Sequence, residues 1–326
     1  MSNAEQLASP QLPPPTGDDR GPQLLHVSWG LTIVATIFIV LRLTCKQMGK
    51  RRNLWWDDWI LIACWFTIIA NDVLLVHLVK TFKLGRHTWE MPHWDDDEQT
   101  QKFWIAIGAR ATLIITAIVW AKTSFAVTLL RLTDGTTRNL LWFLIISMNI
   151  VMGVSAMGPW IQCTPLRRTW DWSVTEGKCW PQGALTKLWM ATGGYSAAID
   201  FALAVIPWTF LWRLTLRRTE KWGIMIAMSM SFIAGVVAIM KCIKLPALGG
   251  GDLYDGVEAF IWDVTEATVT MTACCIPALR VLLRDVKQSA ASDEEGSPHG
   301  QASISLPTIL TSRMNRASRS GYVHAE

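Results

Sequence analysis

Seven apolar stretches of about membrane-spanning length recur along this chain, and they limit what it can fold into. They lie at residues 27–40, 59–79, 105–130, 140–161, 188–212, 222–240 and 257–283. A helix needs about 20 mainly apolar residues to cross a bilayer core of about 30 Å. Only helices and closed barrels satisfy every backbone polar group in lipid, and these stretches lack the alternation of barrel strands. The sequence predicts an all-α, polytopic seven-helix transmembrane bundle, in the plasma membrane or an endomembrane.

The composition agrees with a chain whose main solvent is lipid. Charged residues make up 17% of the sequence, whereas soluble domains carry about 25%. The formal net charge of +4 is too small to indicate nucleic-acid binding. Several of the 19 tryptophans lie at the ends of the apolar stretches, where an amphipathic ring meets the membrane interface. The expected partner is therefore the lipid bilayer, and no nucleic acid is expected.

The basic residues around the first stretch predict the orientation. Lys and Arg are enriched on the cytoplasmic side of membrane proteins. One basic residue, Arg20, precedes the first stretch, and five follow it by position 52. This places the N-terminus outside and, after seven spans, the C-terminus in the cytoplasm. The expected organisation is a disordered outer tail at 1–23, a seven-transmembrane domain at 24–287 and a disordered cytoplasmic tail at 288–326.

Two of the seven cysteines flank one predicted outer loop. Cys163 and Cys179 would lie where disulfides persist, so we expect them to be bonded; the alternative is two free thiols at a helix edge. Closing a loop of about 15 residues stabilises a fold by roughly 3 kcal/mol in the chain-entropy model. The other five cysteines lie in or beside the stretches and are expected to pack as small apolar groups. No metal-ligand spacing is present, so no metal site is expected.

An ordered set of short motifs resembles a known family. The motifs are Trp56-Asp57-Asp58-Trp59, Leu84-Gly85-Arg86-His87-x-Trp89, Ala121-Lys122-Thr123-Ser124-Phe125, Leu130-Arg131-Leu132, Gln162-Cys163-Thr164-Pro165, Gly177-Lys178-Cys179, Asp200 with Pro207, and Cys275-Ile276-Pro277-Ala278-Leu279-Arg280. Together they resemble the fungal rhodopsin-like seven-transmembrane family, named after a satratoxin-cluster membrane protein and related to appressorial surface-sensing receptor-like proteins. The chain departs from the family in lacking a Tyr before Leu130 and in having Lys241 in place of the usual Arg.

The resemblance implies a fungal source and a place in a secondary-metabolite gene cluster or in receptor-like sensing. It does not imply a chromophore. Microbial retinal proteins hold retinal through a Lys of the last span, and the stretch 257–283 contains no Lys. We therefore expect no retinal and no other cofactor.

Ionisable residues inside the apolar stretches are the candidate functional groups, because each costs roughly 2.5–3.5 kcal/mol on insertion scales. They are Asp72, Arg110, Lys122, Asp200, Lys241, Asp263 and Glu266, with His77 near an edge. One interpretation is an outward-facing polar cavity with five ligand-binding residues, namely Asp72, Arg110, Lys241, Asp263 and Glu266. The other is a set of ion pairs that fix helix packing, namely Arg110–Glu266, Lys241–Asp263 and Lys122–Asp200. For the deeper Lys122–Asp200 pair, the structural interpretation is preferred.

Three classes of function remain open at this stage. The first is an accessory or receptor-like component of a secondary-metabolite (mycotoxin) pathway, with a hydrophobic small molecule and cytoplasmic signalling or biosynthetic proteins as partners. The second is a membrane-embedded cyclase or isomerase, in which Asp72, Asp263 or Glu266 protonates a hydrophobic intermediate. A carboxyl group in an apolar cavity retains its proton more readily and can act as a general acid. The third is a transporter, although the sequence lacks a detectable internal repeat.

Overall fold

The computed structural model describes residues 17–48, 55–91, 97–131, 133, 135–171, 173–181, 183–211, 218–249 and 252–295. The chain divides into two units, Met1–Asp285 and Val286–Glu326, and the first contains the bundle. The long helices are α1 (Gly21–Met48), α2 (Trp56–Phe82), α3 (Asp97–Leu130), α4 (Thr136–Ile161), α5 (Ala184–Leu211), α6 (Arg218–Lys244) and α7 (Leu253–Glu295). Short 3-10 helices are η1 (Thr88–Glu90), η2 (Leu166–Thr169) and η3 (Leu245–Gly249).

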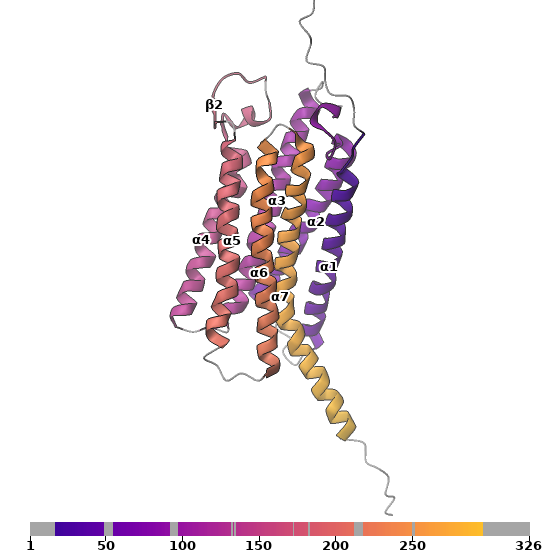
Figure 1. Ribbon diagram of the computed structural model, residues 1–326, viewed down its shortest axis with the longest axis vertical. Helices are drawn as coiled ribbons and strands as arrows, with labels where there is room; N and C mark the ends of the chain where they lie inside the picture. The colour runs from indigo at the N-terminus through magenta and orange to yellow at the C-terminus, as the bar shows by residue number, and fades with distance from the viewer. Residues whose placement is uncertain are drawn as a thin grey trace, which may run out of the picture. The chain divides into compact units, whose positions relative to one another are not determined.

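The seven predicted helices are present in the part of the chain that the structure describes. Each long helix contains one apolar stretch, and all seven are long and apolar enough to cross a membrane. The helices lie side by side in one bundle (Figure 1). The expected limits of the bundle need adjustment, since α1 already begins at Gly21 and α7 continues to Glu295. Residues 288–295 are thus helical. Of the tails expected at 1–23 and 288–326, residues 1–16 and 296–326 lie outside the described residues.

The lateral surface of the bundle exposes many large apolar side chains. Ile33, Phe66, Phe143 and Ile150 are each more than half exposed, at 56%, 60%, 65% and 63%. In water such side chains would be buried, but lipid tails are as apolar as Leu and solvate them well. The distribution of apolar side chains therefore fits a bundle surrounded by hydrocarbon.

The buried apolar residues form two clusters. The larger joins α1, α2, α3, α4, α5 and α7 and includes Ile68, Ile118, Met148, Leu203 and Met271. The smaller joins the start of α1 and the end of α2 to the first turns of α3 and α7. Helix α7 contributes different buried side chains to each cluster, so it connects the two regions of the core.

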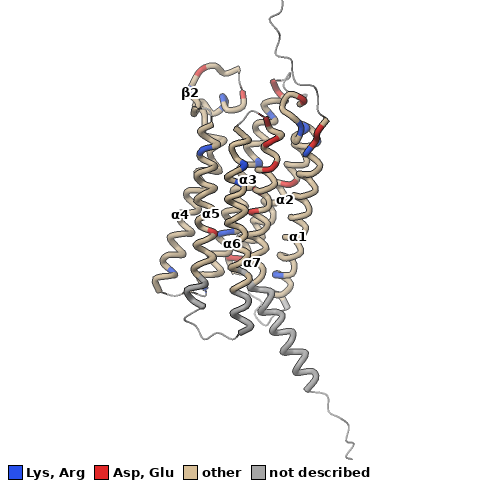
Figure 2. Tube along the Cα trace, viewed as in Figure 1, with Lys and Arg blue, Asp and Glu red and all other residues tan. Residues whose placement is uncertain are grey.

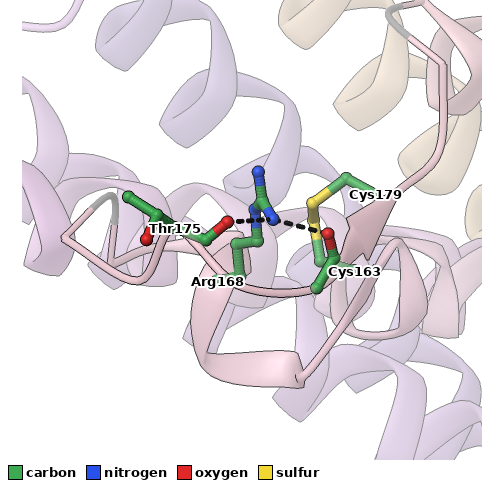
Figure 3. Close-up of a disulfide and its surroundings, with 5 residues drawn as sticks. Cys163, Arg168, Thr175 and Cys179 are labelled. Carbon is green, nitrogen blue, oxygen red and sulfur yellow. Dashed lines mark hydrogen bonds between the residues drawn. A yellow bond between two sulfur atoms is a disulfide. The ribbon is translucent and has the colours of Figure 1, made fainter.

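A short disulfide-closed hairpin joins α4 to α5. Its strands, β1 (Cys163–Thr164) and β2 (Lys178–Cys179), are antiparallel, and Cys163 lies opposite Cys179. The expected Cys163–Cys179 disulfide is present. Arg168 lies beside it and donates to the carbonyl oxygens of Thr175 and Gly177 at 2.8 and 2.6 Å (Figure 3). We call this end of the bundle the disulfide end.

Glycine is required at one position of this hairpin. Gly177 has a φ of +110°, and a Cβ on it would lie 2.1 Å from the carbonyl oxygen of Thr164. Any other residue would strain the backbone and collide with β1. The structure thus explains the glycine of the Gly177-Lys178-Cys179 motif.

The connection between α2 and α3 is tied to two other helices at the disulfide end. Gly85, also at φ +110°, accepts a hydrogen bond from the backbone N–H of Arg20 at 2.9 Å, just before α1. His87 Nδ1 lies 2.6 Å from Asp252 Oδ2, just before α7. The His87 ring also stacks on Tyr254, with centroids 4.2 Å apart. The Leu84–Trp89 motif therefore fixes where α1 and α7 begin.

Candidate functional site

Six of the seven ionisable residues predicted inside the spans form one continuous ionic network. Charged residues occur partway along the helices as well as at their ends (Figure 2). In order of contact, the network runs through Asp200, Lys122, Glu266, Lys241, Asp263 and Arg110. The charges alternate along it, three acidic and three basic, so the network as a whole is neutral.

Glu266 of α7 is the centre of this network. One oxygen, Oε1, lies 2.9 Å from Lys122 Nζ, and the other, Oε2, lies 2.5 Å from Lys241 Nζ. The hydroxyl of Ser196 also donates to Oε1 at 2.9 Å. Glu266 is completely buried, and a buried carboxylate is tolerated only when it is paired and hydrogen-bonded in this way. Glu266 therefore joins α3, α5 and α6 to α7.

Lys122 of α3 anchors the deeper end of the network. Its Nζ lies 2.7 Å from Asp200 Oδ2 and donates to the hydroxyl and carbonyl oxygens of Ser196 at 2.5 and 3.1 Å. The expected Lys122–Asp200 pair is thus present, with Glu266 as a second acidic partner. Since both ions are almost fully buried, this part of the network fixes helix packing.

Arg110 of α3 forms the other end of the network. Its Nη2 lies 3.2 Å from Asp263 Oδ2, and its guanidinium stacks on the ring of Phe260 at 4.0 Å. Arg110 is 2% exposed, yet its Nε has no hydrogen-bond partner among the described residues. A buried N–H without a partner costs about 1–3 kcal/mol, so this donor has capacity for an acceptor.

A cavity of about 230 Å³ lies next to this end of the network. Residues of α3, α4, α5, η2, α6, η3 and α7 form its wall, so it lies between the helices toward the disulfide end. Four tryptophans, Trp104, Trp160, Trp170 and Trp189, line it together with Phe260. The charged residues of the wall are Arg110, Lys241 and Asp263. The cavity is thus mainly aromatic and apolar with one charged side, whereas a polar cavity lined by three carboxyl groups was expected.

Most polar groups on the cavity wall already have protein partners. The indole N–H of Trp160 donates to Thr112 Oγ1 at 2.8 Å, and Ser155 and Thr192 share a hydrogen bond of 2.9 Å. Thr169 Oγ1, on η2, is a second polar atom of the wall without a partner in the described part of the chain. The polar atoms of the wall without a protein partner in the described residues therefore include Arg110 Nε and, on the disulfide-closed loop, Thr169 Oγ1.

Asp72 of α2 does not line this cavity and lies outside the chain of ion pairs, but it interacts electrostatically with Arg110 of the network. It accepts hydrogen bonds from Ser28 Oγ at 2.5 Å, Thr32 Oγ1 at 2.6 Å and Asn71 Nδ2 at 3.2 Å. No ion pair to Asp72 is found within the described ranges. The carboxyl group therefore binds α1 to α2 through hydroxyl groups.

A second buried ionic cluster lies at the opposite end of the bundle. Arg42 of α1 donates to Asp57 and Asp58 of α2 at 2.6 and 3.0 Å, and also to the carbonyl oxygen of Cys274 on α7. Lys46 contacts Asp58 at 2.5 Å, and Arg131, at the end of α3, contacts Asp57. We call these five charged residues the Arg42 cluster. They join four helices.

The Arg42 cluster was not among the predicted site residues. Arg42 was counted with the basic residues of a cytoplasmic loop, but the structure buries it to 1% exposure. Its partners Asp57 and Asp58 belong to the Trp56–Trp59 motif, and paired acidic residues directly before an apolar stretch are the signal that could have indicated this cluster.

Two carboxyl groups outside the spans have pKa values displaced by their surroundings. Burial opposes ionisation of Asp252, but hydrogen bonds from His87 and from the backbone N–H groups of Tyr254 and Thr88 outweigh it. The pKa of Asp252 therefore lies below its usual range. In the disulfide loop, the Ser173 hydroxyl, assisted by Arg167, likewise lowers the pKa of Asp171.

Comparison with known proteins identifies the family. Residues 41–285 match the fungal rhodopsin domain, which is well over half of the chain. The chain belongs to the fungal rhodopsin domain family. The resemblance drawn from the motifs is thus confirmed.

Two curated relatives of this fungal rhodopsin domain carry names from biosynthetic clusters. "Fugralins biosynthesis cluster protein 2" of Gibberella zeae is 24% identical over 127 residues, 38% of this chain and 31% of the relative. "Satratoxin biosynthesis SC1 cluster protein 4" of Stachybotrys chartarum is 24% identical over 132 residues, 39% of this chain and 45% of the relative. The matches span less than half the length of either relative. No solved structure matches the chain.

The fungal rhodopsin domain brings together some predicted site residues and separates others. Arg110, Lys241 and Asp263 line the cavity, whereas Asp72 and Glu266 do not. The expected Arg110–Glu266 pair is wrong, because Arg110 contacts Asp263 instead. Glu266 lies three residues, or about 4.5 Å, farther along α7 than Asp263, which brings it to Lys122. Lys241 pairs with Asp263 at 3.7 Å, as expected, and more closely with Glu266.

Proposed function

We propose that this fungal membrane protein is an accessory or receptor-like component of a secondary-metabolite pathway, and that it binds a hydrophobic small molecule in the tryptophan-lined cavity. The cavity beside Arg110 is the observation that carries the proposal. Small-molecule sites are concave and mainly apolar, with a few polar groups that orient the ligand. Four tryptophans around about 230 Å³ with one charged side have this character. The cluster names of both relatives support the metabolic setting.

The pairing of the carboxyl groups favours binding over acid catalysis. A general acid must hold a transferable proton and lie within reach of the substrate. Of the three catalytic candidates, only Asp263 lines the cavity, and it pairs with both Arg110 and Lys241. Glu266 and Asp72 are buried away from this cavity, so the arrangement serves ligand recognition better than protonation.

The proposal includes an orientation. We infer that the disulfide end faces outside or the lumen, because disulfides persist there, and that the C-terminus is cytoplasmic. The cavity would then receive its ligand from the outer side or the outer leaflet. A protease-cleavable C-terminal tag in sealed vesicles tests this orientation. Cleavage of the tag by protease added only to the outer face of the membrane contradicts it.

A cavity-filling substitution tests the function. Ala111 lines the cavity and is 7% exposed, so Ala111→Trp fills the space. A deletion strain complemented with Ala111→Trp should show the altered metabolite profile of the uncomplemented deletion, as measured by mass spectrometry. The matched control is Val73→Trp, since Val73 is 56% exposed on α2 and its replacement faces outward. Normal metabolite levels with correctly folded Ala111→Trp would contradict the proposal.

A second measurement separates receptor-like action from catalysis. If the deletion strain accumulates an intermediate, membranes that contain the protein should fail to convert it in vitro. Conversion by these membranes, abolished by Asp263→Asn, would instead establish the membrane-embedded enzyme.

A further inference from the structure

We propose that the cavity binds a neutral molecule of one or two rings that bears a carbonyl group, and that Arg110 donates a hydrogen bond to that carbonyl oxygen. This inference rests on the proposed function and specifies the class of ligand. It draws on four properties of the site, namely its volume, its aromatic walls, its charge balance and its unused donor.

The volume limits the size of the ligand. A dry cavity of about 150 Å³ in another protein holds one benzene molecule. The cavity here measures about 230 Å³, which leaves room for a second ring or a short substituent. A ligand of one or two rings therefore fits within this volume.

The walls favour a flat ring system. Trp104, Trp160, Trp170 and Trp189 come from α3, α4, the disulfide loop and α5, so aromatic rings surround the space from several directions. Trp160 and Trp170 already form an edge-to-face pair with centroids 6.1 Å apart. Offset or edge-to-face aromatic contacts contribute about 0.5–1.5 kcal/mol each beyond the area they bury. A planar ligand can make several such contacts at once.

The charge balance favours a neutral ligand. The cavity-lining ions Arg110, Lys241 and Asp263 belong to a network with equal numbers of acidic and basic residues. A carboxylate or an ammonium group in the cavity would add an uncompensated charge to this buried, balanced set, and an unpaired buried charge is strongly unfavourable. A carbonyl oxygen accepts a hydrogen bond without changing the balance.

The unused donor supplies the polar contact. Arg110 has one ion pair, to Asp263, and its Nε has no partner in the residues that the structure describes. The guanidinium is held against Phe260 by stacking, so its N–H groups are oriented before a ligand arrives. A preoriented donor loses little conformational entropy on binding.

Three probes with the same ring system test the proposal. The two-ring ketone 1-tetralone, the hydrocarbon tetralin and the carboxylate tetralin-1-carboxylate are titrated calorimetrically into the full-length protein in lipid nanodiscs, with empty nanodiscs as the partition control. We expect 1-tetralone to bind about tenfold more tightly than either of the others, the gain from one hydrogen bond to a charged donor. Equal affinities, tighter carboxylate binding or no binding of 1-tetralone would each overturn the inference.

Paired variants assign the contact to Arg110. Arg110→Met combined with Asp263→Asn removes the donor and keeps the network balanced at two acidic and two basic residues. This variant should bind 1-tetralone no better than tetralin, with tetralin affinity unchanged. A tenfold preference that survives in a folded double variant would overturn the assignment.

The outcomes also separate this inference from the proposed function. If 1-tetralone and tetralin bind equally and Ala111→Trp blocks both, the carbonyl assignment fails while ligand binding in the cavity stands. If Ala111→Trp leaves the metabolite profile normal, the proposed function fails whichever probe binds best.

Discussion

Arg42 Nε lies 3.0 Å from Asp58 Oδ1, and both side chains are at most 2% exposed. This contact ties the end of α1 to the first turn of α2. In the sequence, Arg42 looks like part of a basic loop and Asp58 like part of an acidic helix start, but the two form a buried ion pair. Breaking such a pair by removing one partner costs about 3–5 kcal/mol, because it leaves an uncompensated charge.

Asp58→Asn should therefore lower the thermal stability in detergent substantially, by about 3 kcal/mol or more. Adding Lys46→Met should recover part of the loss, because Lys46 lies 2.5 Å from Asp58 and would otherwise lack its closest acidic partner. Glu98→Gln is the matched control, since the Glu98–Lys102 pair is 74% and 62% exposed and such pairs contribute about 0–1 kcal/mol. Equal effects of Asp58→Asn and Glu98→Gln would contradict the prediction.

Glu266→Gln should destabilise the bundle by about 3–5 kcal/mol, because Lys122 and Lys241 would share a smaller buried negative charge. Neutralising Lys241 to Met in the same chain should restore much of the stability. Neutralising Arg110 should not, since Arg110 contacts Asp263 and not Glu266. Thermal unfolding in detergent measures all three variants, and rescue by the Arg110 variant alone would contradict the observed pairing.

Replacing Cys163 and Cys179 by Ser should lower stability by roughly 3 kcal/mol through loss of loop closure. Thr169 and Trp170, on the loop closed by this disulfide, line the cavity, so the variant should also bind 1-tetralone more weakly. Mass mapping under non-reducing conditions checks the bond in protein from the native membrane. Two free thiols at these positions would contradict the expectation.

The interaction between His87 and Asp252 should respond to acid. The pKa of Asp252 is lowered in the folded protein, so its ionised form stabilises the fold. This stabilisation is complete above the unfolded pKa of about 3.9 and is lost as the pH falls through the lower folded value. The difference in Tm between the wild type and Asp252→Asn should therefore shrink below about pH 4. A difference that grows on acidification would contradict this sign.

Purified protein supplied with all-trans retinal should show no visible absorption band, because the stretch 257–283 contains no Lys. The bundle does contain two buried lysines, Lys122 and Lys241, but both are held in ion pairs. A retinal band lost in Lys122→Ala would contradict the prediction and identify Lys122 as the attachment site.

The candidate site was only partly predictable. The cost of placing an ionisable side chain in a bilayer identified seven candidates, of which six lie in one network. The candidates were Asp72, Arg110, Lys122, Asp200, Lys241, Asp263 and Glu266. Depth along a helix axis gave the pairs Lys122–Asp200 and Lys241–Asp263 but not the partner of Arg110. Asp263 and Glu266 lie about one helical turn apart on α7. Which of them contacts Arg110 therefore depends on how α7 is rotated and shifted against α3.

The sequence by itself determined the class of fold. The seven apolar stretches predicted the bundle, the cysteine pair around one loop predicted the disulfide, and the ordered motifs predicted the family. This was possible because few backbone structures satisfy their hydrogen bonds in lipid, and local sequence patterns identify them. Only the tertiary structure decided that Arg42 is buried, that Asp72 lies outside the chain of ion pairs, and that four tryptophans enclose a cavity beside Arg110. Those features arise from contacts between helices far apart in sequence, and a one-dimensional pattern does not encode how the helices rotate against each other.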